Sequence, residues 1–256
     1  MMVVATLLIA VGASDVARLV LGAALGWRRD RLLGTAVGVV LGAAVALGVG
    51  IGAWVAVLLF VTVWQFATRP GRHRAAAAVV GLLGLLVVTV LGLGSLQPSP
   101  TGPLVTWYDA LPYAGLATVP PEVAAIVAGS TLFLIESANV VVRLALAPLT
   151  AKEATAEERR ADDGAVLFRS PDDVLELPLP GGRLIGPLER ILILALALAG
   201  QFTAIGAVVA AKGIIRFPEI SKDSAGGSKA EFFIVGSLAS WVLVGGAVAL
   251  TGLGAA

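Results

Sequence analysis

The sequence contains no cysteine and only one histidine, His73. The lack of cysteine excludes disulfides, thiolate metal sites and a cysteine nucleophile, although it leaves the redox compartment undetermined. A single histidine argues against a histidine-rich metal site and against a Ser-His-Asp triad. The glycine-rich runs contain neither phosphate-binding pattern, G-x-x-x-x-G-K-[ST] or G-x-G-x-x-G. We therefore expect no metal and no cofactor, and whether the chain is an enzyme stays open.

Charged residues are also scarce. They make up 14% of the chain, whereas hydrophobic residues reach 58%, and a soluble domain carries about 25% charged residues. Apolar runs longer than about 18 residues recur, and each is long enough to cross a bilayer core of about 30 Å. The net charge of +1 implies no polyanionic partner, so no nucleic acid is expected. The sequence predicts an all-α, polytopic bundle of transmembrane helices that contacts membrane lipids.

Charged clusters and glycine-rich turns divide the chain into about seven predicted spans. They are residues 1–27, two spans within 32–67 that meet at a turn over 48–52, then 75–96, 121–147, 187–217 and 232–253. The first five spans form an N-terminal membrane region, 1–149, and the last two form a C-terminal region, 187–256. Between these regions lies an acidic segment, 150–186. Within it, residues 152–163 predict a short charged helix. Apolar and polar residues alternate weakly over 174–177, which is typical of a strand.

Residues 97–122 differ in composition from the spans around them. They contain six prolines, and their only charges are acidic. Prolines oppose a regular helix, and amphipathic aromatic rings such as Trp107 favour the membrane interface. We expect an outer loop that lies on the membrane, with a lid over a substrate as the alternative.

The distribution of lysine and arginine predicts the orientation in the membrane. The loops 28–31 and 69–74 are basic, whereas 48–52 and 97–122 contain no lysine or arginine. Short cytosolic loops are enriched in these residues. The N-terminus should therefore lie outside, and the acidic segment 150–186 should lie in the cytosol, for a chain in the inner (plasma) membrane.

The predicted span 187–217 has two interpretations. Arg190 and Lys212 are separated by 22 residues, about 33 Å of helix, which fits one crossing. One crossing would place Lys212 and Arg216 outside, against the orientation rule. A re-entrant hairpin that turns at Gly200 and Gln201 would keep them inside and would give eight membrane segments. We expect a single crossing, because the length argument is the more direct one.

Two membrane spans carry charges within their apolar runs. Asp15 and Arg18 are three residues apart and share one helix face. Glu136, Asn139 and Arg143 lie at offsets of zero, three and seven, within about 60° of arc. A charge at the bilayer centre costs roughly 2.5–3.5 kcal/mol on insertion scales, so such residues pair or line a polar cavity. These five residues predict one intramembrane polar network, either a route for a solute or a structural lock. Arg143 has a third interpretation, an anchor that extends to the interface.

Small residues recur at a spacing of four in the second predicted span, at Gly34, Gly38 and Gly42. Such stripes let two membrane helices approach closely. We expect this stripe to serve packing within the chain, with a homo-oligomer interface as the alternative.

The C-terminal third carries a recognisable pattern. Its pieces are the run from Gly182 to Arg190, then Ala210 to Gly213, then Arg216 to Glu219, and less closely Ala230 to Phe233 with Gly236 and Ser237. These pieces resemble an uncharacterised family of bacterial multi-pass integral membrane proteins, most closely its actinobacterial members. A similar tail closes membrane proteins that carry a domain of unknown function. The resemblance implies a membrane protein and no particular chemistry.

The same region supplies charged and polar candidates near the membrane surface, namely Glu189, Arg190, Gln201, Lys212 and Arg216. The cations are suited to lipid phosphates, or they anchor the helix ends. Three functions follow. The first is a transport or permeation protein, or its membrane subunit, lined by the intramembrane network. The second is an enzyme acting on a lipid-linked or phosphate-bearing substrate at the inner leaflet. The third is a scaffold that recruits a protein partner through residues 150–183.

Overall fold

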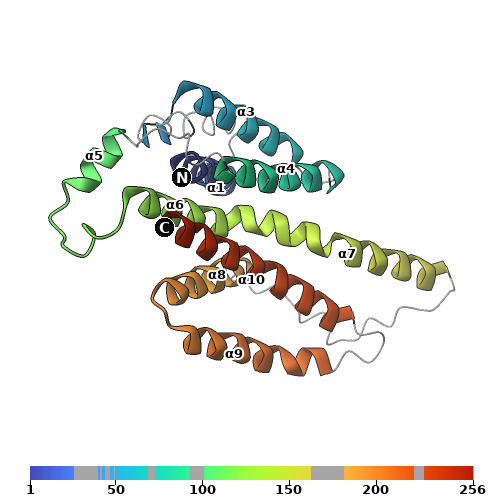
Figure 1. The fold of residues 1–256 in the computed structure, drawn as a ribbon. Coiled ribbons are helices and arrows are strands. Elements are labelled where there is room, and N and C mark those ends of the chain that lie inside the picture. The colour runs from blue at the N-terminus through green and yellow to red at the C-terminus, as the bar shows by residue number, and fades with distance from the viewer. Residues whose placement is uncertain are drawn as a thin grey trace. The chain divides into compact units, whose positions relative to one another are not determined.

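The computed structural model describes residues 1–25, 40, 42–43, 47–48, 50–68, 73–92, 101–162, 182–221 and 228–255. Every regular element in this part of the chain is helical, as the composition predicts (Figure 1). The chain forms two compact units. The first contains Met1–Val141 and Leu243–Ala256, and the second contains Val142–Val242.

The first unit is built around α1 (Met2–Leu25), which packs mainly against α6 (Pro121–Leu132) and η2 (Phe133–Ser137), a π-helical turn that continues α6. Helix α3 (Ile51–Ala67) also packs on α1, and α4 (His73–Gly92) packs on both. An apolar cluster joins α1 to α5 (Pro103–Asp109) and α6. The buried positions of α1 include Val4, Leu7 and Val11, so α1 is the central helix of this unit.

The second unit contains α8 (Gly182–Leu198) and α9 (Phe202–Ser221), which form a hairpin, together with parts of α7 (Ala138–Asp162) and α10 (Ser228–Ala255). Helix α7 begins in the first unit and continues η2, so residues 121–162 are helical throughout, with Pro148 inside. Helices α8 and α9 pack side by side around a turn at Gly200, whose φ is +70° (Figure 1). Helix α10 begins in this unit and ends in the first.

Several expectations need correction. The single continuous helix expected over 187–217 is wrong, because one helix ends at Leu198 and a second begins at Phe202. A glycine with positive φ reverses the chain there, and this local signal outweighs the length argument. Helix α8 also starts before Pro187, and α9 continues past Pro218. Residues 97–122 are not all loop, because Pro103 occupies the first turn of α5, where its missing N–H costs nothing.

The count of seven spans is likewise not supported. Among the described residues, three helices are long and apolar enough to cross a membrane: Met2–Val20, Pro121–Lys152 and Ala230–Ala255. Two shorter apolar helices are Ile51–Ala67 and Arg74–Val88. The turn expected over 48–52 does occur, with Gly48 at a φ of +68° and α3 starting at Ile51. The expected strand over 174–177, and most of the second span with Gly34 and Gly38, lie outside the described residues.

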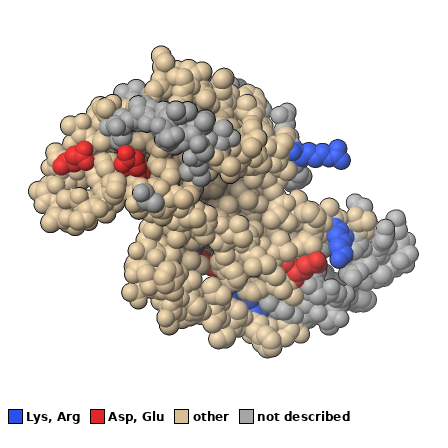
Figure 2. Space-filling model, viewed as in Figure 1, with Lys and Arg blue, Asp and Glu red and all other residues tan. Residues whose placement is uncertain are grey.

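The surfaces of these helices are strongly apolar. Helix α3 buries Phe60 and Trp64, yet it also exposes a stripe of large apolar side chains that includes Ile51, Leu59 and Val63. The face shown in Figure 2 carries few charged side chains. A soluble monomer rarely exposes such contiguous apolar surface. Lipid contact accounts for it, in agreement with the three membrane-length helices.

Candidate functional site

The centre of the candidate site is Asp15, a fully buried carboxylate on α1. The i,i+3 spacing brings Arg18 beside it, and Arg18 Nη2 lies 2.7 Å from Asp15 Oδ1. The side chain of Asp15 is 0% exposed and that of Arg18 is 30% exposed. The ion pair therefore has one end in the core of the unit and one end near its surface.

Helix α3 supplies two further donors to the same carboxylate. Trp64 Nε1 donates to Asp15 Oδ2 at 2.9 Å, and Gln65 Nε2 donates to Asp15 Oδ1 at 3.0 Å. The two residues are adjacent, and both lie on the buried face of α3. Trp64 is held in place by ring contacts with Phe60 and Phe133. Packing thus holds the indole ring in place, with its N–H directed at the carboxylate of Asp15.

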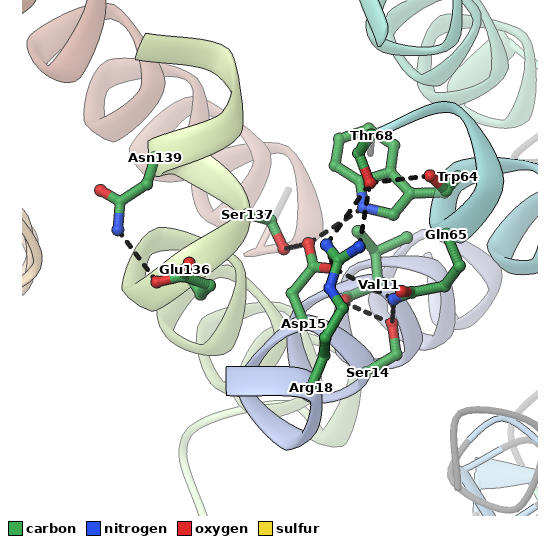
Figure 3. Close-up of polar contacts among 10 residues, drawn as sticks. All are labelled: Val11, Ser14, Asp15, Arg18, Trp64, Gln65, Thr68, Glu136, Ser137 and Asn139. Atoms are coloured by element: carbon green, nitrogen blue, oxygen red, sulfur yellow. Dashed lines mark hydrogen bonds and ion pairs between the residues drawn. The ribbon is translucent and has the colours of Figure 1, made fainter. Parts of the chain in front are cut away.

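The fourth donor comes from the π-helical turn η2. Ser137 Oγ lies 2.7 Å from Asp15 Oδ2, and it is buried (Figure 3). A π turn closes i→i+5 hydrogen bonds, and such turns occur frequently at functional sites. Each oxygen of Asp15 therefore has two donors, and the four donors come from α1, α3 and η2.

Polar neighbours surround this cluster. Gln65 Nε2 also donates to Ser14 Oγ at 2.8 Å, and Ser14 Oγ in turn donates to the carbonyl of Val11. Both terminal nitrogens of Arg18 lie 3.4 Å from Thr68 Oγ1. Arg18 and the hydroxyl of Thr68 extend the cluster toward the end of α3. We refer to the polar residues together as the Asp15 cluster: Ser14, Asp15, Arg18, Trp64, Gln65, Thr68 and Ser137.

Two of the other predicted network residues contact each other. Glu136 is buried, and Asn139 Nδ2 donates to its Oε2 at 3.1 Å (Figure 3). Arg143 is exposed on α7 and belongs to the second unit. Glu136 lies within the π turn, so the arc computed for a regular helix does not hold across it. The carboxylates of Glu136 and Asp15 point in different directions in Figure 3.

A second charged cluster lies in the second unit. Lys212 Nζ lies 2.6 Å and 2.8 Å from the two carboxylate oxygens of Glu189 and so joins α9 to α8. Trp241 Nε1 of α10 donates to Glu189 Oε1 at 3.4 Å. Lys212 also lies about 6 Å from the ring centres of Phe233 and Trp241. Lys212 is thus engaged by a carboxylate and two aromatic rings, which argues against an open phosphate site at its ammonium group.

The remaining surface candidates are dispersed. Arg190 is buried, with an exposed fraction of 1%. Arg216 is exposed near the end of α9, and Gln201 is exposed in the turn, where its Nε2 donates to the carbonyl of Ala199. Among the described residues, no group of three His, Cys, Asp or Glu side chains is arranged to hold a metal ion.

Sequence reasoning missed most partners of Asp15, namely Ser14, Trp64, Gln65, Thr68 and Ser137. One signal was present, because Gln65 is an amide in the long uncharged stretch 32–67. Its pairing with Ser14 and Asp15 depends on how α3 is rotated against α1. No local pattern in the sequence predicts that rotation. Comparison of the chain with protein-family models, curated proteins and solved structures finds no match.

Proposed function

We propose that the chain is a transport or permeation protein of the inner membrane, or the membrane subunit of one, in which Asp15 takes up and releases a proton. The observation that carries this proposal is a fully buried carboxylate within an apolar helix, paired to a half-buried arginine and hydrogen-bonded from three elements. Ionisable groups within membrane helices mark ion pathways and proton relays.

The chemistry of Ser137 supports this choice of cargo. A hydroxyl both donates and accepts, so Ser137 Oγ, 2.7 Å from Asp15 Oδ2, can accept a hydrogen bond from a protonated carboxyl after its own O–H turns away. Arg18 would then lose its counter-ion, and its side chain is exposed enough to turn toward water. Proton uptake thus gives the cluster two arrangements, one in which Arg18 is paired with Asp15 and one in which it is released. A permeation cycle needs such a two-state element.

Proton flux into proteoliposomes tests the proposal. With a trapped pH-sensitive dye and a potassium diffusion potential, wild-type protein should acidify the interior faster than empty liposomes do. Asp15→Asn should reduce the rate to that of empty liposomes. Thr62→Val is the matched control, because Thr62 lies on α3 and bonds only to the carbonyl of Leu58. Equal fluxes for wild type and Asp15→Asn, or no flux above empty liposomes, would refute proton permeation.

The orientation is part of the same proposal. We place α3 and α4 in the membrane beside the three longer helices, because α3 and α4 expose large apolar side chains. The bacterial family that the C-terminal pattern resembles is consistent with this location. The N-terminus lies outside and residues 150–186 lie in the cytosol, as the basic loops 28–31 and 69–74 favour.

Single cysteines in this cysteine-free chain test the orientation. Thr155 and Thr118 are both exposed threonines, and they flank the candidate span Pro121–Lys152 in the sequence. In intact cells an impermeant maleimide should label Thr118→Cys and should label Thr155→Cys only after permeabilisation. The reverse pattern would invert the topology.

The two alternative functions have less support from the structure. An enzyme acting on phosphate-bearing lipid needs a free cation near the interface, whereas Lys212 is bound to Glu189. A scaffold that recruits a partner through residues 150–183 stays a prediction, because residues 163–181 lie outside the described residues.

A further inference from the structure

We infer that α8 and α9 form a re-entrant hairpin, which inserts its tip among the acyl chains of one leaflet and returns to the side from which it came. The hairpin lies in the second unit and Asp15 lies in the first. Its insertion therefore does not depend on proton uptake.

The first argument is length measured between charges. The arm of α8 beyond Arg190 runs from Ile191 to Leu198, about 12 Å of helix, and the arm of α9 from Phe202 to Ala211 is about 15 Å. Half of a hydrocarbon core of about 30 Å is about 15 Å. Each uncharged arm is therefore at most about half as long as the hydrocarbon core is thick, so neither arm crosses it.

The second argument is the position of the charges. Glu189, Arg190, Lys212 and Arg216 all lie at the base of the hairpin, and the stretch between Arg190 and Lys212 carries no charge. The ion pair between Glu189 and Lys212 joins the two arms at this base. The charged base of the hairpin therefore suits the membrane interface, and the uncharged tip suits the hydrocarbon core.

The third argument is the chemistry of the turn. Gly200 N–H donates to the carbonyl of Ala197 at 3.0 Å, and Gln201 N–H donates to that of Leu196 at 2.8 Å. These bonds, with Gly200 in the left-handed region, make a Schellman motif. The carbonyl of Gln201 accepts from Ile205 N–H, so the turn also begins α9. Backbone groups in lipid need internal partners, and these three bonds supply partners for part of the turn.

The fourth argument is the surface of the tip. Residues 198–203 are all exposed, and Phe202 is 70% exposed. In water a phenylalanine at a hairpin tip loses the stabilisation that burial would give it. Among acyl chains that apolar surface is solvated. Lysine and arginine at the base then lie on the cytosolic side, as the orientation rule requires.

Spin labels test the insertion in full-length protein reconstituted in phosphatidylcholine and phosphatidylglycerol vesicles. Gln201→Cys marks the tip and Ser221→Cys marks the base, and both positions are exposed. The tip label should collide with dissolved oxygen and not with a water-soluble nickel chelate, because oxygen concentrates in the hydrocarbon. The base label should collide with the nickel chelate.

Maleimide labelling and cross-linking separate the competing arrangements. In intact cells an impermeant maleimide should leave Gln201→Cys unlabelled. Labelling of the tip from outside would show two crossings and would overturn the inference. Nickel collisions at the tip would place the hairpin in water, and disulfide-linked dimers through Gln201→Cys would place it against a second copy; either result also overturns it.

Discussion

Replacing Asp15 with alanine should lower the free energy of unfolding by about 3–5 kcal/mol, the range typical for removing one partner of a buried ion pair. The substitution leaves Trp64 Nε1, Gln65 Nε2 and Ser137 Oγ without their acceptor in the core of the unit. It also leaves the guanidinium of Arg18 without its counter-ion. Equilibrium unfolding in detergent micelles measures the loss.

The matched variants separate the charge from the hydrogen bonds. Arg18→Gln should cost less than Asp15→Ala, because Asp15 keeps three donors and Arg18 is partly exposed. Asp15→Asn should also cost less than Asp15→Ala, since the amide oxygen still accepts. In the double-mutant cycle of Asp15→Ala and Arg18→Gln, we expect a coupling energy of about 0.5–3 kcal/mol. Additive losses would mean that the two charges do not stabilise one another.

Local features of the sequence were enough for some of this molecule. The helices and the membrane class follow from long apolar runs, and the pairing of Asp15 with Arg18 follows from i,i+3 geometry. The turn before α3 follows from a glycine-rich run, and its Gly48 has a positive φ. Each of these features depends on residues that are close together in the sequence, so no tertiary information was needed.

The rest depends on how helices rotate and where they break. Trp64 and Ser137 are separated from Asp15 by 49 and 122 residues, and only the packing of α3 and η2 on α1 brings them to it. The π turn at Glu136 rotates the side chains that follow it relative to those before it. A regular period of 3.6 residues does not predict this rotation. At Gly200 a local glycine turn with positive φ ends the helix, although the uncharged run around it is long enough for one crossing.

The structure also contains a close glycine contact that the sequence did not predict. The stripe at Gly34, Gly38 and Gly42 was expected to serve packing, yet a Cβ placed on Gly42 would meet nothing within 4 Å. Gly34 and Gly38 lie outside the described residues. A Cβ on Gly12 would lie 2.5 Å from Phe133 N and 2.6 Å from Leu132 C. A close approach of two helices in the described part of the chain is therefore that of α1 to the junction of α6 with η2.

Gly12→Ala should consequently destabilise the protein, whereas Gly42→Ala should not. Alanine favours a helix over glycine by about 1 kcal/mol, so an unobstructed substitution is neutral or stabilising. At Gly12 the new methyl group meets backbone atoms, which cannot turn away as a side chain can. Overpacking of this kind typically costs about 1–3 kcal/mol. The opposite signs of the two changes make the pair diagnostic.

The same substitution should weaken the Asp15 cluster, because Gly12 lies one helical turn before Asp15 on α1. Moving α1 away from η2 lengthens the contact between Asp15 and Ser137, which is 2.7 Å in the native packing. We expect Gly12→Ala to lower both the unfolding free energy in detergent and the proton flux in proteoliposomes, with Gly42→Ala matching wild type in both. If Gly12→Ala unfolds at the same free energy as Gly42→Ala, then α1 and η2 do not pack this closely in the membrane, and Ser137 does not act on Asp15.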